Sequence, residues 1–123
     1  MHKILIVEDE TSLREIYSEV LKDAGYGVIE AGDGETAETL IKSGDWDLLL
    51  LDIMLPKLDG MTVLKEKSQN QMLKDKPVIV ISNLDNEDII KQCMEGGASG
   101  YLVKSNISPQ ELVDNVNKHF TNA

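Results

Sequence analysis

The chain has 123 residues, the size of one domain, and can bury a hydrophobic core without disulfides or metals as staples. It carries 12 basic and 22 acidic residues, for a net charge of −10, and Arg14 is the only arginine. Direct nucleic-acid binding is therefore not expected, because proteins that bind nucleic acids concentrate Lys and Arg on one face. No apolar stretch reaches the length of a membrane span, and the amino terminus enters a strand-like run at once, so we expect a cytoplasmic protein without a signal peptide.

Apolar runs alternate with helix-like segments five times along the chain, a pattern typical of an α/β domain with a parallel sheet covered on both faces. The predicted strands lie at residues 4–7, 28–31, 48–51, 78–81 and 101–103. The second run is the least apolar, which suits an edge strand. We therefore predict a flavodoxin-like, doubly wound five-stranded parallel sheet in the order 2-1-3-4-5, with five helices, as one domain over residues 1–123.

Capping residues and apolar spacing mark the helices between these strands. The expected apolar face of the first helix consists of Leu13, Ile16, Tyr17, Val20, Leu21 and Ala24. In the last helix, Ser108, Pro109 and Glu111 combine an N-cap, a proline at the first helical position and a capping-box glutamate. The lone Cys93 cannot form an internal disulfide, and its spacing suits the buried side of the fourth helix.

Polar residues stand directly after four of the predicted strands. Glu8 and Asp9 follow the first strand, Asp52 the third, Ser82 the fourth and Lys104 the fifth. Since all strands of a parallel sheet point one way, these residues should gather at one edge, where such folds bind ligands. Three close carboxylates repel one another by roughly 4 kcal/mol per pair at an effective dielectric constant of about 20, so a bound divalent cation is the natural remedy. Mg²⁺ suits this set, because it takes oxygen ligands and commonly uses one or two protein carboxylates.

Taken singly, these residues also have ordinary structural explanations. The acids at 8–10 could complement the dipole of the following helix. Lys104 could be a surface lysine, Ser82 a helix-entry residue and Tyr101 a core or edge aromatic. Their occurrence together, in this order and at these strand ends, favours a shared site.

With Leu55–Gly60 following Asp52, the set resembles a bacterial two-component response-regulator receiver domain from Lys3 to about Phe120. The resemblance implies a phosphorylation-activated switch rather than an enzyme that turns over an external substrate. In such a phosphorelay, Asp52 would accept a phosphoryl group from a histidine kinase or a phosphotransfer protein.

The same resemblance implies roles for the other residues of the site. Asp9 and Asp52 would ligate Mg²⁺ directly, together with the backbone carbonyl of Met54, and Glu8 would act through a water. Lys104 would pair with Asp52 at rest and with a phosphoryl oxygen after transfer.

Ser82 would donate a hydrogen bond to the phosphoryl group, and Tyr101 would be its rotameric partner in the switch. Phosphorylation would then change the surface formed by the fourth helix, fifth strand and last helix, where a downstream protein target would bind.

The chain also departs from the family pattern. Ser105 follows Lys104 where many receivers have a cis-proline; a cis bond to serine would cost about 3 kcal/mol, so we expect strain or a differently shaped loop. Asn83 follows Ser82 where many relatives carry a smaller residue, which could narrow access to the hydroxyl. The last helix lacks the paired charges of receivers that dimerise in winged-helix regulators, which argues against dimerisation of that type.

Four other functions account for these residues less well. A phosphatase of the haloacid dehalogenase kind places a second acid two residues after its aspartate, where this chain has Met54. The acids at 8–10 would repel the phosphate of a flavin, and a phosphohistidine carrier is disfavoured because His2 and His119 lie at the chain ends. A degenerate interaction module that no longer takes phosphate remains an alternative, although the chain retains all five polar residues.

Overall fold

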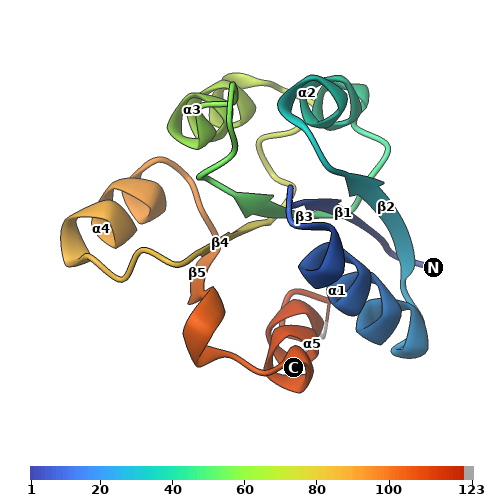
Figure 1. Ribbon diagram of the computed structural model, residues 1–123. Helices are drawn as coiled ribbons and strands as arrows, with labels where there is room; N and C mark the ends of the chain where they lie inside the picture. The colour runs from blue at the N-terminus through green and yellow to red at the C-terminus, as the bar shows by residue number, and fades with distance from the viewer. Residues whose placement is uncertain (121–123) are drawn as a thin grey trace.

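The computed structural model describes residues 1–120 and shows five parallel strands between two layers of helices (Figure 1). The strand order is β2-β1-β3-β4-β5, which confirms the predicted flavodoxin-like architecture. The elements in chain order are β1 (Lys3–Val7), α1 (Thr11–Asp23), β2 (Gly27–Ala31), α2 (Gly34–Ser43), β3 (Leu48–Asp52), α3 (Gly60–Gln69), β4 (Val78–Ser82), α4 (Glu87–Glu95), β5 (Gly100–Val103), a 3₁₀ turn (Lys104–Asn106) and α5 (Pro109–Asn117).

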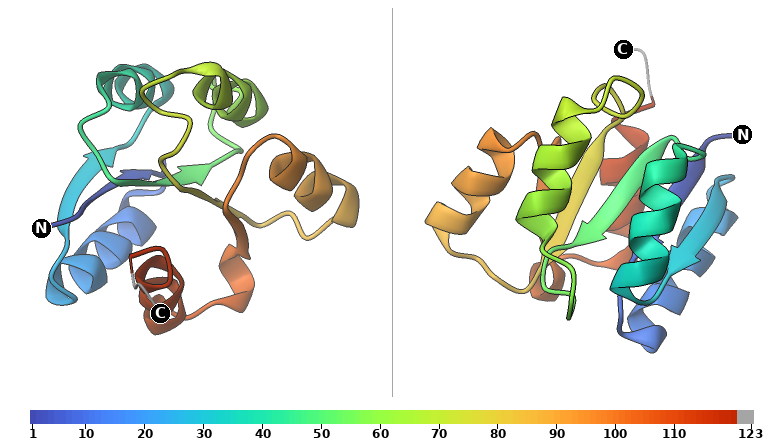
Figure 2. Two further views of the ribbon diagram at one scale, coloured as in Figure 1. Left: turned by 180° about the vertical axis from the view of Figure 1, so that it is seen from behind. Right: turned by 90° about the horizontal axis from the view of Figure 1, so that it is seen from above.

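The sheet has a hydrophobic core on each face, because successive side chains of a strand point to opposite sides. One face packs against α1 and α5, and the other against α2, α3 and α4 (Figures 1 and 2). Leu48 and Leu50 belong to the first core, whereas Leu49 and Leu51 belong to the second. Cys93 is fully buried in the second core, as predicted.

The helix ends follow the local chemistry expected of them. Asp33 accepts a hydrogen bond from the backbone N–H of Thr36 at 2.7 Å, and Gly44 closes α2 with a left-handed φ of 70°. The predicted capping box is present at the start of α5, where Ser108 and Glu111 cap each other's backbone.

Ile16 and Ala24 are exceptions on the predicted apolar face of the first helix, because Ile16 is 45 % exposed and Ala24, which directly follows the helix, is exposed as well. The buried face of α1 runs through Tyr17 and Leu21, which are four residues apart, and Ile16 lies beside that line. None of the helices formed by residues 1–120 combines the length and the apolar character that crossing a bilayer would require. The last three residues of the predicted domain lie outside the described part of the chain.

Candidate functional site

The predicted polar residues lie at the carboxyl-terminal ends of four strands. Glu8 and Asp9 follow β1, Asp52 and Ser82 are the last residues of β3 and β4, and Lys104 follows β5 directly. The parallel pairing of the strands, β1 with β3, β3 with β4 and β4 with β5, brings these ends to one edge of the sheet.

Three acids form the centre of this site. One carboxylate oxygen each from Glu8, Asp9 and Asp52 lies within 4.8 Å of the others. Glu8 and Asp52 are buried, with 0 % and 3 % of their surface exposed, whereas Asp9 is exposed. The turn after β3 orients Asp52, whose Oδ1 accepts a hydrogen bond from the backbone N–H of Met54 at 2.8 Å.

Lys104 joins two of the acids. Its ammonium donates to Asp52 Oδ2 at 2.8 Å and also forms an ion pair with Glu8 Oε1. Burial alone would lower the pKa of Lys104, but its hydrogen bonds to Asp52 and Glu8 and their negative charges raise that pKa above the ordinary value. The pairing of Lys104 with Asp52 was expected from the sequence, whereas its contact with Glu8 was not.

Burial has the largest effect on the pKa of Glu8. It raises the pKa of this carboxyl above its ordinary value, although the hydrogen bond and charge of Lys104 act in the opposite direction. Glu8 Oε2 accepts from the backbone N–H of Glu10 at 3.1 Å. Glu8 Oε1 is buried, and within residues 1–120 its polar contact is the one with the Lys104 ammonium.

This donor set fits a small hard cation. All three side chains offer carboxylate oxygens, which Mg²⁺ prefers, and they converge from two neighbouring strand ends. Glu8 Oε1 has spare acceptor capacity inside the cluster. The residues present are therefore compatible with a divalent metal ion.

Ser82 and Tyr101 are linked through one backbone residue. The fully buried Ser82 Oγ accepts a hydrogen bond from the N–H of Leu84 at 3.1 Å. The hydroxyl of the half-buried Tyr101 donates to the carbonyl of the same Leu84 at 2.7 Å. A shift of Leu84 would therefore move the partners of both side chains.

The loops beside the acids have two unusual backbone features. Lys57, in the loop between β3 and α3, has a φ of 64°, which is uncommon for a residue other than glycine. Gly60 lets α3 start close to the turn after Asp52, because a Cβ there would lie 2.7 Å from the Cα of Ile53. Ser105 lies in the 3₁₀ turn after β5, and the peptide bonds of the described residues are all trans.

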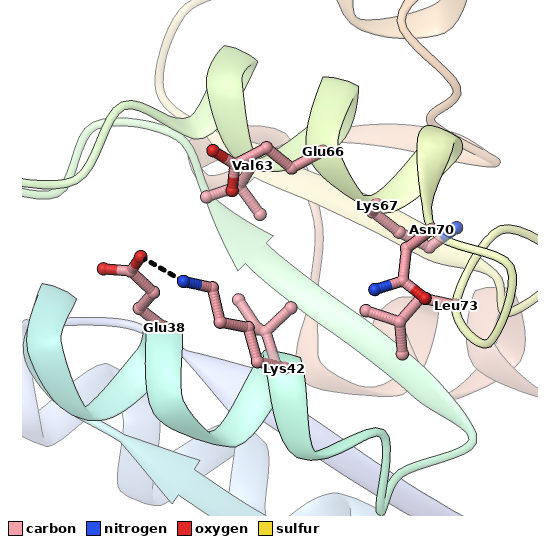
Figure 3. Close-up of a pocket in the computed structure, with 8 residues that line it drawn as sticks. Glu38, Lys42, Val63, Glu66, Lys67, Asn70 and Leu73 are labelled. Atoms are coloured by element: carbon pink, nitrogen blue, oxygen red, sulfur yellow. Dashed lines mark hydrogen bonds and ion pairs between the residues drawn. The ribbon is translucent and has the colours of Figure 1, made fainter.

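A separate pocket lies between α2 and α3, away from the acids. Figure 3 shows Glu38 and Lys42 of α2 on one side of it and residues of α3 on the other, with the Glu38–Lys42 bond of 2.8 Å. Its volume of about 70 Å³ is small beside that of ordinary ligand sites, and none of the predicted site residues lines it.

Arg14 is the residue at this edge to which sequence reasoning assigned no role. Its Nη1 donates a hydrogen bond to the backbone carbonyl of Glu8 at 2.7 Å. The available signal was the position of the only arginine in the first turns of α1, where a cation opposes the helix dipole and needs a partner.

Comparisons with known proteins identify the family of this chain. The family model described as "Response regulator receiver domain" matches residues 4–117. The chain is 34 % identical to the chemotaxis protein CheY of Pseudomonas aeruginosa over 119 residues, which cover 96 % of this chain and 95 % of that protein. It is 37 % identical to the phosphate regulon transcriptional regulatory protein PhoB of the same organism over 110 residues, covering 89 % of this chain but only 48 % of PhoB.

Among solved structures, the BeF₃-activated N-terminal receiver domain of Klebsiella pneumoniae RstA superposes with a TM-score of 0.87 at 30 % sequence identity. The match covers 98 % of this chain and 100 % of the RstA domain.

Proposed function

The chain belongs to the family of response-regulator receiver domains, and we propose that it works as the phosphoacceptor of a two-component phosphorelay. Receiver domains serve phosphorylation-dependent signalling. In the proposed reaction, Asp52 takes a phosphoryl group from a histidine kinase or phosphotransfer protein, with Mg²⁺ as cofactor and no turnover of an external substrate. The observation that carries the proposal is the contact of Lys104 with Asp52, beside the carboxylates of Glu8 and Asp9.

The acids supply the metal site of this proposal. Asp9 and Asp52 would hold Mg²⁺ together with the backbone carbonyl of Met54, and Glu8 would act through a water. When bound, the ion neutralises the clustered negative charge and stabilises the charge of the transferring phosphoryl group.

Asp52 acts as the nucleophile. One of its carboxylate oxygens forms a bond to phosphorus while the bond between phosphorus and the donor breaks, so the ionised carboxylate has no proton to lose. Lys104 then turns from the carboxylate of Asp52 to a phosphoryl oxygen, which its compact ammonium can do without a fixed donor geometry. The Ser82 hydroxyl donates a hydrogen bond to another phosphoryl oxygen and keeps its proton.

The Leu84 backbone connects this chemistry to the surface. Because Ser82 and Tyr101 both bind Leu84, a Ser82 hydroxyl drawn toward the phosphoryl group would shift the loop that holds the Tyr101 ring. The surface of α4, β5 and α5 would change with it and be presented to a downstream protein. In this proposal, the loop at Leu84 is the two-state element that a phosphorylation switch requires.

Beryllofluoride, a mimic of the phosphoryl group, tests the switch. In the presence of Mg²⁺ it should shift amide resonances along α4, β5 and α5, and Lys104→Ala should reduce the distant shifts. Lys22→Ala is the matched control, because Lys22 is an exposed lysine of α1, outside the surface whose shifts are measured. Shifts confined to the surroundings of Asp52 in the wild type would contradict the switch, and no shifts at all would favour a module that does not take phosphate.

A further inference from the structure

Arg14 contacts two separate segments at the edge of the sheet. It extends from α1, donates to the carbonyl of Glu8 at 2.7 Å, and places its Nε 3.3 Å from Oε1 of Glu30 in β2. Its side chain is only 18 % exposed. The two contacts use different nitrogens of the guanidinium, Nη1 and Nε, whereas a lysine at this position would have to reach both acceptors from one nitrogen.

The carbonyl that Arg14 binds belongs to the peptide bond between Glu8 and Asp9. The N–H of Glu8 donates to the carbonyl of Ala31 at 3.1 Å, so both backbone groups of Glu8 are held. The Asp9 side chain, by contrast, is exposed and makes no hydrogen bond within residues 1–120. The position of the Asp9 carboxylate therefore depends on how firmly this peptide is held.

Gly32 makes room for the guanidinium. A Cβ at this position would lie 2.7 Å from Nη1 and 3.2 Å from Cζ of Arg14. The backbone of Gly32 has no positive φ that would require glycine, so the contact with Arg14 is the steric reason for the missing side chain. A side chain at position 32 would therefore have to displace the guanidinium of Arg14.

We propose that Arg14 is a positioning residue for the divalent cation. It fixes the Glu8–Asp9 peptide against β2 and so holds the carboxylates of Glu8 and Asp9 in place relative to Asp52. This inference rests on the proposed function, because it assumes that the three acids bind Mg²⁺. Outer partners that orient metal ligands typically change metal affinity by roughly 10–100-fold when mutated.

The two ways in which Arg14 could act, as a nearby positive charge or by holding the Glu8–Asp9 peptide, predict different affinities for Mg²⁺ in its variants. If Arg14 acted only as a nearby positive charge, Arg14→Lys would leave the affinity unchanged, and Arg14→Gln would raise it by removing a repelling cation. If Arg14 positions the peptide, both variants should bind Mg²⁺ roughly tenfold more weakly. Lys42→Gln, which removes an exposed cation paired with Glu38 on α2, is the control for the general effect of charge.

The test is a Mg²⁺ titration of the full chain followed by amide resonances near Asp52, at a temperature where every variant is folded. Gly32→Ala should weaken binding as Arg14→Lys does, because its methyl group displaces the guanidinium. In the Arg14→Gln background, the same Gly32→Ala change should have almost no further effect. General structural damage would instead add in the double variant.

The outcomes separate this inference from the proposed function. Weaker binding by Arg14→Lys and Gly32→Ala, without additivity in the double variant, supports the positioning role. Wild-type affinity in Arg14→Lys, or tighter binding by Arg14→Gln, overturns that role while leaving the metal site intact. A wild-type protein that binds no Mg²⁺ overturns the proposed metal site itself, and the inference with it.

Discussion

Asp9→Asn should stabilise the protein without metal and remove its stabilisation by Mg²⁺. Asp9 has two carboxylate neighbours, Glu8 and Asp52, and Lys104 contacts those two rather than Asp9. Its negative charge is therefore unfavourable in the metal-free fold and useful only when a cation is bound. Asparagine keeps the shape of the side chain and removes the charge.

The geometry sets the size of the effect. At the 4.8 Å limit between carboxylate oxygens, each repulsion is about 3.5 kcal/mol at an effective dielectric constant of about 20 and about 0.9 kcal/mol in water. Asp9 is exposed, so the lower value is the better guide, and physiological salt reduces it further. Two such repulsions, partly offset by the positive charge of Lys104, leave an expected gain of about 1 kcal/mol in the free energy of unfolding.

Urea unfolding in chelator and in excess Mg²⁺ measures this prediction. The wild type should gain about 2.7 kcal/mol when Mg²⁺ is at about 100 times its dissociation constant, whereas Asp9→Asn should gain much less. The order of stability should thus reverse between the two conditions. Glu15→Gln is the control, since it makes the same change in charge on the exposed surface of α1.

Two results would refute this reasoning. A metal-free Asp9→Asn protein less stable than the wild type would show that Asp9 is not repelled by its neighbours. Equal stabilisation of both proteins by Mg²⁺ would show that the ion binds without Asp9.

Three further predictions concern the neighbouring residues. Lys57→Gly should raise the free energy of unfolding by about 0.5–1 kcal/mol, because glycine accepts the φ of 64° without a steric penalty; a loss of stability in urea would contradict this. Met54→Asn combined with Leu84→Gln should speed loss of the phosphoryl group from Asp52 roughly tenfold, which corresponds to a barrier lower by about 1.4 kcal/mol. The reason is that the side chains of Met54 and Leu84 cannot orient a water through a strong hydrogen bond. Intact mass measured over time checks this, and equal or slower loss would mean that Met54 and Leu84 do not set the lifetime of the phosphorylated state. Burial raises the pKa of Glu8, so the folded metal-free protein retains this proton to higher pH than the unfolded chain does. The contribution of Glu8 to the free energy of unfolding therefore falls as pH rises through the folded pKa. Glu8→Gln should remove that fall, and an unchanged dependence of stability on pH in this variant would argue against it.

The fold was predictable because its strands are unusually apolar. Leu48–Leu51 is an unbroken apolar run whose side chains are buried on both faces of the sheet, whereas an amphipathic helix would alternate apolar and polar positions. The lower hydrophobicity of β2 correctly indicated an edge strand. The capping box at Ser108 marked the start of α5 at the correct residue. These signals are local, so a single sequence contains them.

The side-chain partners at the sheet edge were less predictable. Lys104 follows β5, which is not a neighbour of β1, yet its ammonium reaches Glu8 as well as Asp52. This contact depends on side-chain length and on the twist of the sheet, neither of which appears in strand order. The role of Arg14 was missed for the same reason, because its partners are a backbone carbonyl and the space above a glycine. Ile16 shows the limit of helical spacing, which identifies the apolar side of α1 but not the edge of the buried stripe.

The most direct test of the account is the intact mass of the protein after incubation with a small-molecule phosphodonor, with and without Mg²⁺. The account predicts a single phosphoryl adduct that forms only with Mg²⁺, maps to Asp52 and is absent from Asp52→Asn. Trp46 fluorescence would be a poor substitute, because that side chain is buried before β3, at the opposite end of the sheet. An adduct that persists in Asp52→Asn, or a wild type that takes no phosphoryl group under any of these conditions, would contradict the account.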